Sequence, residues 1–124
     1  MTAGDDSSGQ TPLGLERVDD PRAYASAARR AGKLVVWVPR GVRSKQKLFG
    51  IFSRALRFPS YFGWNWDACE ECLSDLSWLP EKISIVIAHE QLPFGDGENG
   101  RIYWEILRAA AGSRRDGRTI ETVY

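Results

Sequence analysis

Two short runs of apolar, β-favouring residues, separated by an amphipathic segment, constrain the fold of this chain most strongly. The run over residues 33–38, KLVVWV, is almost continuously apolar, and the run over residues 82–88, KISIVIA, is similar. Continuous apolar runs of this length are typical of strands buried on both faces, as in a parallel sheet covered by helices. The sequence therefore predicts an α/β fold with a parallel sheet.

Helix signals lie before, between and after these runs. Asp20 and Pro21 form a favourable N-cap and first helical position, and from Ser44 apolar residues recur at spacings of three and four. We expect helices at residues 21–31, 44–57, 66–77 and 102–111, and strands at residues 33–38, 82–88 and 118–124. These elements predict a small three-stranded parallel sheet packed with about four helices.

The length of the chain, 124 residues, fits a single hydrophobic core. Residues 1–16 are mostly polar and are predicted to form a flexible N-terminal tail, and residues 17–124 a single domain. The sequence shows neither a secretion signal nor the roughly 18 consecutive apolar residues of a membrane span. We therefore expect a cytoplasmic protein.

Charge is strongly segregated along the chain. Residues 21–57, the basic block, carry ten Lys or Arg and no acid, whereas residues 58–100 carry eight acids and a single base, Lys82. Such blocks predict a protein with a charged working face.

The most unusual passage is FPSYFGWNW, residues 58–66, which has five aromatic residues. Pro59 and Gly63 within it exclude a long helix or a central strand. Asn65 is a favourable N-cap for the helix that follows. The passage is therefore predicted to be an aromatic loop that leads into a helix.

Residues 58–68, FPSYFGWNWDA, continued by Cys72-Leu73, resemble the signature of the barstar family. The order of elements over residues 33–124 is similar as well. The resemblance implies a three-stranded parallel sheet packed against helices, and an inhibitor of a ribonuclease that needs no cofactor and catalyses no reaction. It further implies that the aromatic loop and the following helix insert into the phosphate-binding cleft of the enzyme.

Carboxylates gather on one side of the predicted helix over residues 66–77. Helical spacing places Asp67, Glu71 and Asp75 on one stripe, with Glu70 beside them. No base occurs from residue 58 to residue 81. Carboxylates can replace phosphate oxygens in charge-assisted hydrogen bonds to Arg and Lys, so the stripe could mimic RNA. The alternative interpretation is an ordinary solvated helix face.

Of the aromatic residues, Tyr61 and Trp64 are the better interface candidates, because large amphipathic rings dominate binding hot spots and Gly63 between them allows close approach. At least two of Phe58, Phe62 and Trp66 are expected in the core. The candidate partner-binding residues are Tyr61, Gly63, Trp64, Asn65, Trp66, Asp67, Glu70, Glu71 and Asp75.

The chain departs from the family pattern at two positions. Glu71 stands where the best-known member has Asp, and Ala110 stands where the family has a second acidic contact. Together with the basic block, these differences leave open a toxin partner other than a basic ribonuclease.

Three alternatives remain at this point. The pair Cys69 and Cys72 has the C-x-x-C spacing of redox and zinc sites, but both lie on the apolar side of the helix and His89 is the only histidine, so we expect no metal site. A nucleic-acid-binding module would use the basic block, with aromatic residues for base stacking. A dimerisation domain would self-associate, whereas an inhibitor is expected to be a monomer when free.

Overall fold

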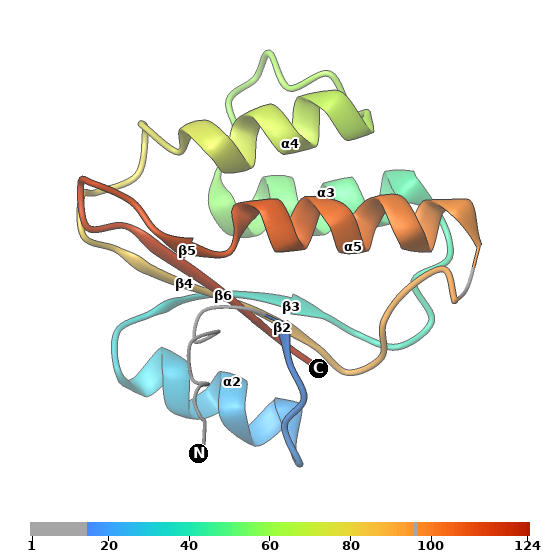
Figure 1. Cartoon of the computed structure of the whole chain (residues 1–124), viewed down its shortest axis with the longest axis horizontal. Helices are drawn as coiled ribbons and strands as arrows, with labels where there is room; N and C mark the ends of the chain where they lie inside the picture. Colours follow the sequence, from blue (N-terminus) through green and yellow to red (C-terminus); the bar gives the residue numbers. More distant parts are fainter. Residues whose placement is uncertain (1–14, 96) are drawn as a thin grey trace, which may run out of the picture.

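The computed structural model describes residues 15–95 and 97–124, so the expected tail lies, as far as residue 14, outside the described residues. The elements are, in chain order, β2 (Leu15–Glu16), α2 (Pro21–Arg30), β3 (Leu34–Val38), α3 (Lys45–Leu56), α4 (Trp66–Asp75), β4 (Ser84–His89), α5 (Glu98–Ala110), β5 (Gly112–Ser113) and β6 (Thr119–Val123) (Figure 1). These elements confirm the α/β class and the four helices that the sequence predicts.

The sheet has five strands in the described residues, and so the prediction of three strands is wrong in number. Its order is β2-β6-β4-β3, all parallel, and β5 pairs with β6 in antiparallel orientation. The three predicted strands correspond to β4 and β6 in the centre of the sheet and β3 at one edge. The two additional strands, β2 and β5, are only two residues long each, too short for a period of two to be visible in the sequence. Strand β2 consists of Leu15 and Glu16, the last two residues of the predicted tail, which pair with β6.

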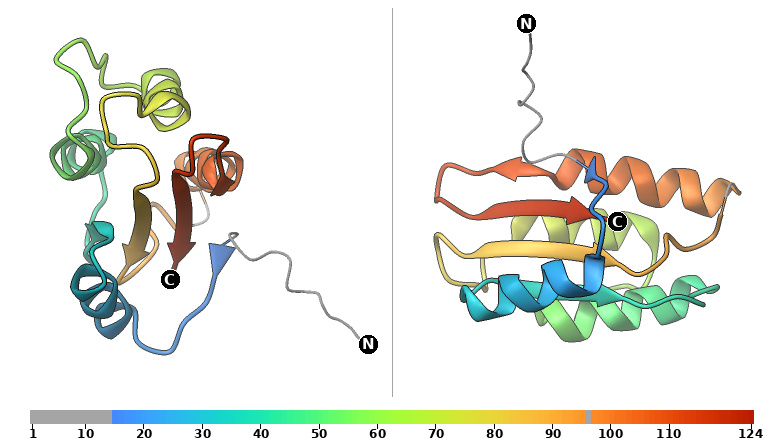
Figure 2. Two further views of the ribbon diagram at one scale, coloured as in Figure 1. Left: turned by 90° about the vertical axis from the view of Figure 1, so that its left-hand side faces the viewer. Right: turned by 90° about the horizontal axis from the view of Figure 1, so that it is seen from below.

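Helices cover both faces of this sheet. Figure 2 shows α3, α4 and α5 nearly end-on above one face, and α2 alone on the other. The larger core lies under the three helices and includes Ile85 and Ile87 of β4. The smaller core lies under α2, where Ala25 and Ala28 pack against the strands. The continuous apolar run of β3 predicts burial on both faces, and the structure shows it in the middle of β3 and along most of β4.

Polar side chains cap the first three helices: Asp20 and Asn65, as predicted, and Ser44, which the sequence predicts only as the start of a helix. The side chains of Asp20, Ser44 and Asn65 each accept a hydrogen bond from the backbone N–H three residues later, at 3.1, 3.1 and 2.8 Å. Helix α5 begins at Glu98, four residues before its apolar periodicity starts, and its N-cap is Gly97. No helix among the described residues is long and apolar enough to cross a membrane.

Candidate functional site

The aromatic loop, residues 58–65, is fixed to the core by two of its rings. Phe58 and Phe62 are buried, with ring centroids 4.9 Å apart, and Phe62 packs edge-on against Phe49 of α3 at 5.8 Å. The N–H of Phe62 donates to the carbonyl of Pro59 at 3.0 Å and closes a tight turn. These contacts anchor the loop. The burial of Phe58 and Phe62 confirms the expectation that at least two of the aromatic residues belong to the core.

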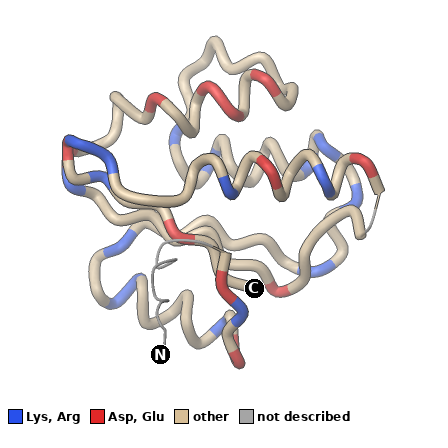
Figure 3. The backbone as a smooth tube through the Cα atoms, in the orientation of Figure 1, with Lys and Arg blue, Asp and Glu red and all other residues tan. Residues whose placement is uncertain are grey.

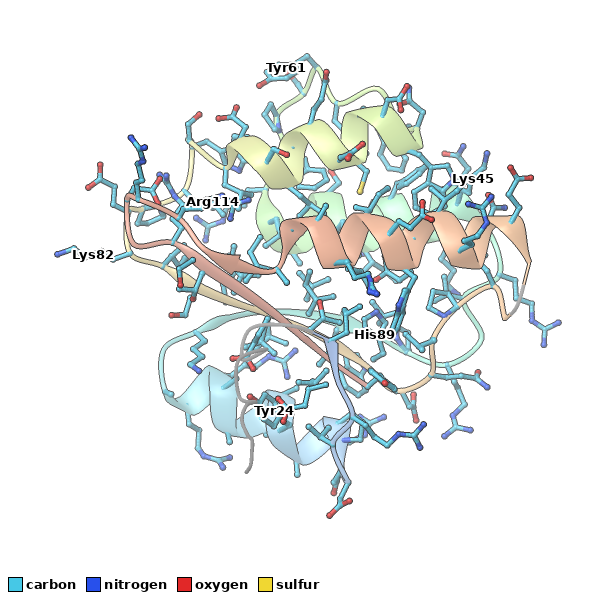
Figure 4. The ribbon with its side chains drawn as sticks, in the orientation of Figure 1. Tyr24, Lys45, Tyr61, Lys82, His89 and Arg114 are labelled. Atoms are coloured by element: carbon cyan, nitrogen blue, oxygen red, sulfur yellow. The ribbon has the colours of Figure 1, made fainter. Side chains whose placement is uncertain are left out.

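The other two rings of the loop face solvent. Tyr61 is 75% exposed and Trp64 45%, and they are the exposed large hydrophobic residues of the described chain. Tyr61 projects from the tip of the loop beyond α4 (Figure 4). Trp64 has a left-handed backbone conformation, with φ of 55°, and its ring lies 5.6 Å from that of Phe62. Exposed rings on a well-anchored loop can contact a partner without a large loss of conformational entropy.

Asn65 and Gly63 form the junction between the loop and α4. The side chain of Asn65 caps the helix and also donates from Nδ2 to the carbonyl of Gly63 at 3.3 Å. A Cβ atom at residue 63 would lie 3.2 Å from that nitrogen, so glycine leaves room for the cap. Both residues therefore position the site.

Trp66 turns inward from the first turn of α4 and is half-buried. Its ring packs near Phe49, Phe94 and Tyr103, at centroid distances of 5.1, 5.9 and 6.1 Å. Its Nε1–H donates to Oδ1 of Asn99 at 3.2 Å, which ties α4 to α5. Of the nine candidate residues, Trp66 is thus the one whose side chain packs against the core.

The four carboxylates of α4 are all exposed. Within residues 15–95 and 97–124, none of Asp67, Glu70, Glu71 and Asp75 has an Arg, Lys or His nitrogen within 4.0 Å. Figure 3 shows α4 with acidic residues and no basic ones along its length. The acidic stripe that the spacing predicts is therefore present, and its charges are not neutralised by the described part of the chain.

A shallow pocket of about 270 Å³ lies between the aromatic loop and α4. Its lining residues are Tyr61, Phe62, Gly63, Ala68, Glu71, Cys72 and Asp75. Tyr61, Phe62 and Ala68 contribute apolar atoms to its wall, and Glu71 and Asp75 contribute carboxylates. The structure thus brings Tyr61 together with Glu71 and Asp75, whereas Trp64, Asp67 and Glu70 lie outside this pocket.

The two cysteines are free thiols on the inward side of α4. Burial raises the pKa of Cys69 to about 12, and burial also raises the pKa of Cys72. Because the thiolate is the reactive and metal-binding form, neither cysteine is suited to redox or metal chemistry at neutral pH. Among the described residues no group of three or more His, Cys, Asp or Glu is placed to hold a metal ion.

His89 is a buried residue of the core, away from α4. Its Nδ1 lies 3.0 Å from the carbonyl oxygen of Val123 and its Nε2 lies 2.8 Å from the hydroxyl of Tyr103. The carbonyl can only accept, so Nδ1 carries the proton and Nε2 accepts from Tyr103. Burial lowers the pKa of His89 to about 4, which keeps the ring neutral at pH 7.

Two residues that support the site were not found from the sequence. Arg114, beyond α5, donates to the carbonyl of Leu73 in the last turn of α4. Gly50 of α3 lies under the ring of Trp64. The sequence signal for Arg114 was an unusual density of arginines after residue 107. The sequence signal for Gly50 was a glycine inside a helical pattern.

Comparison with known proteins gives one match. Neither the curated proteins nor the solved structures contain a match to this chain. The family model described as Barstar (barnase inhibitor) matches residues 33–124, which include every element from β3 to β6. Proteins of that family are inhibitors rather than enzymes, and they bind ribonuclease partners. Since the match covers well over half of the chain, including the aromatic loop and α4, this protein belongs to the barstar family.

Proposed function

We propose that this protein inhibits a cognate ribonuclease or related toxin by covering its active site with the aromatic loop and the outward face of α4. It would act in the cytoplasm, as a monomer when free, and protect the RNA of the cell that contains it. The observation that carries the proposal is the set of four exposed carboxylates on α4 that have no ion-pair partner in the described chain.

The chemistry of these carboxylates fits a phosphate-binding cleft. A ribonuclease holds the phosphates of its substrate with Arg and Lys, and carboxylates accept the same charge-assisted hydrogen bonds, often in pairs from one guanidinium. Asp67, Glu71 and Asp75 follow one another at intervals of four residues, so they lie about 6 Å apart along the helix axis. A row of negative groups on a rigid helix resembles the row of phosphates along an RNA strand.

The pocket beside α4 can receive one basic side chain of the partner. The aliphatic part of an Arg or Lys would lie against Ala68 and the ring of Tyr61, and its charged head would reach Glu71 or Asp75. Such a contact is specific, because it requires an apolar wall and a carboxylate at fixed positions. Glu71, which is one methylene longer than Asp, lies in this pocket.

The remaining candidate residues divide into contacts and supports. Tyr61 and Trp64 present exposed rings, which are frequent at the centres of interfaces. Gly63 allows close approach of the partner to the loop, while Asn65 and Trp66 hold the loop and helix in place.

The structure weakens the alternative in which the whole basic block binds nucleic acid. The block is divided between α2 and α3, which lie on opposite faces of the sheet (Figure 2). On the side of α2, Arg22 and Arg40 pair with Glu90, and Lys33 pairs with Glu121. The ten bases therefore do not form one continuous surface.

A capture experiment from source cells tests the proposal. Wild-type protein is expected to retain a small nuclease and to block its activity, whereas Asp67→Ala/Glu71→Ala is expected to bind at least about tenfold more weakly, since charged hydrogen bonds are lost. The variant Asp19→Ala/Glu81→Ala, with the same change in charge away from α4, should bind as the wild type does. The proposal fails if the two double variants retain the nuclease equally. If circular dichroism shows that Asp67→Ala/Glu71→Ala is unfolded, the single variant Glu71→Gln replaces it, and the proposal fails if folded Glu71→Gln binds as tightly as the wild type.

A further inference from the structure

Helix α3 carries a row of basic residues opposite its buried face. Leu48, Phe49, Phe52 and Leu56 are buried against the sheet. Lys47, Gly50 and Arg54, at spacings of three and four, fall on the opposite side, and Arg57 follows at the end of the helix. Lys47, Arg54 and Arg57 are exposed. We call Lys47, Gly50, Arg54 and Arg57 the α3 stripe.

The charges of the α3 stripe are not neutralised by the described part of the chain. Residues 21–57 contain no acid, and none of the three bases of the stripe lies within 4.0 Å of a carboxylate among the described residues. Arg43 and Lys45, at the start of α3, add two further exposed bases without such a partner in that part. By contrast, three bases of the basic block near α2, namely Arg22, Lys33 and Arg40, form ion pairs with carboxylates.

An exposed aromatic ring lies on the same stripe. A Cβ atom at Gly50 would be 3.8 Å from two ring carbons of Trp64 and 4.0 Å from Nη2 of Arg54. The indole therefore crosses α3 at its glycine, beside the guanidinium of Arg54, and remains 45% exposed. At these distances a Cβ atom would be in ordinary van der Waals contact with the ring, so the indole lies directly against the helix at this position.

We propose that the α3 stripe and Trp64 form a second binding surface, which takes a short single-stranded nucleic acid. Lys47, Arg54 and Arg57 would contact phosphates, and a base would stack on the free face of the indole. An acidic protein segment would be attracted by the charges alone, but the exposed ring among them favours a ligand that alternates anionic and flat aromatic groups. Nucleic acid has that alternation at every nucleotide.

This surface is distinct from the acidic face of α4, although Trp64 lies at the edge of both. The proposed inhibitor function uses carboxylates, whereas the α3 stripe has only bases, so neither inference depends on the other. At physiological salt, charge interactions between exposed groups are largely screened beyond about 8 Å, which allows two faces of opposite sign on one small domain.

Fluorescence anisotropy with the full chain tests the proposal, using labelled oligo(U) and oligo(dT) of about 12 nucleotides. Binding is expected at about 50 mM salt and should weaken steeply by about 200 mM. Lys47→Ala/Arg54→Ala should lose about tenfold in affinity, whereas Arg29→Ala/Arg30→Ala, which removes the same charge from α2, should change it less than about twofold. Trp64→Ala should lose about fivefold or more.

An abasic strand of the same length separates stacking from charge without any change to the protein. It should bind more weakly than oligo(U), because it keeps the phosphates and lacks the bases. Binding of either labelled strand supports the proposal, and a tighter complex with oligo(U) assigns it to RNA. The proposal is overturned by no binding at low salt, by equal losses in the α2 and α3 variants, by an abasic strand that binds as tightly as oligo(U), or by polyglutamate that competes as well as either strand.

Discussion

The hairpin of residues 113–118 and helix α4 both carry several charges, but two arginines of the hairpin, Arg114 and Arg118, are directed into the protein, whereas the carboxylates of α4 are directed into solvent. Arg118 is 7% exposed and donates to the carbonyl of Leu79 and to Asp116. Arg114 donates to the carbonyl of Leu73. In α4, by contrast, the four carboxylates are exposed and contact no base in the described chain.

The difference shows which charges maintain the fold and which are available for binding. A buried guanidinium with fixed acceptors cannot be removed without leaving polar groups unsatisfied. An exposed carboxylate without a partner can be removed at little cost. The two regions also meet, because Arg114 satisfies a carbonyl in the last turn of α4 and places positive charge at the negative end of that helix. The hairpin thus helps to hold the acidic face in position.

The largest expected effect is on the hairpin. Arg118→Ala should lower the free energy of unfolding by about 4 kcal/mol, because it leaves the Leu79 carbonyl without its donor and opens a cavity in a packed site. Urea unfolding monitored by tryptophan fluorescence measures the change. Arg115→Ala, at the exposed position directly after Arg114, removes the same charge and should change stability by less than about 0.5 kcal/mol. Equal losses from the two variants would contradict the division between structural and available charges.

The second largest expected effect is the dependence of the free energy of unfolding on pH, which the buried imidazole of His89 causes. Its pKa of about 4 in the folded protein lies below the ordinary value of about 6.5, so the unfolded chain binds the proton more readily. This contribution to stability is complete above pH 6.5 and is lost as the pH falls towards 4, by about 3 kcal/mol in total. His89→Gln keeps a neutral polar side chain and should flatten the pH profile of unfolding between pH 6.5 and 5, where no other histidine titrates.

A profile that keeps its slope in His89→Gln would show that other groups cause the loss of stability. Ordinary carboxylates titrate near pH 4, below this window. Asp116, whose carboxyl accepts hydrogen bonds from the backbone and side chain of Arg118, has a lowered pKa and contributes only at still lower pH. The comparison between pH 6.5 and 5 therefore isolates the buried imidazole.

Local sequence rules were sufficient for the elements that build the site. The caps at Asp20, Ser44 and Asn65, the buried run of β4 and the inward direction of Phe58 and Phe62 all follow from residue type and spacing. The acidic stripe of α4 was equally predictable, since helical periodicity alone decides which residues share a face. The family membership rested on a longer motif and is confirmed by the match over residues 33–124.

Features that depend on distant segments were not predictable. Strands β2 and β5 exist because β6 offers them hydrogen-bonding partners, and two residues carry no periodicity of their own. The donation from Arg114 to Leu73 joins segments 41 residues apart, and the contact of Trp64 with Gly50 depends on how the loop folds back on α3. Likewise, the division of the basic block between two faces follows from the path of the chain and not from its composition.

The smallest expected effect, on α4, completes the comparison. Glu71→Gln should raise the free energy of unfolding by about 0.4 kcal/mol, because Glu71 lies four residues from both Asp67 and Asp75 and like charges at that spacing repel. Differential scanning calorimetry should show a slightly higher Tm at low salt, and the gain should vanish near 1 M salt, where charge interactions are screened. Glu81→Gln, outside the helix, should show no such gain. A clear loss of stability in Glu71→Gln would instead mean that this carboxylate has a partner within the protein, and its availability to a ribonuclease would then have to be reconsidered.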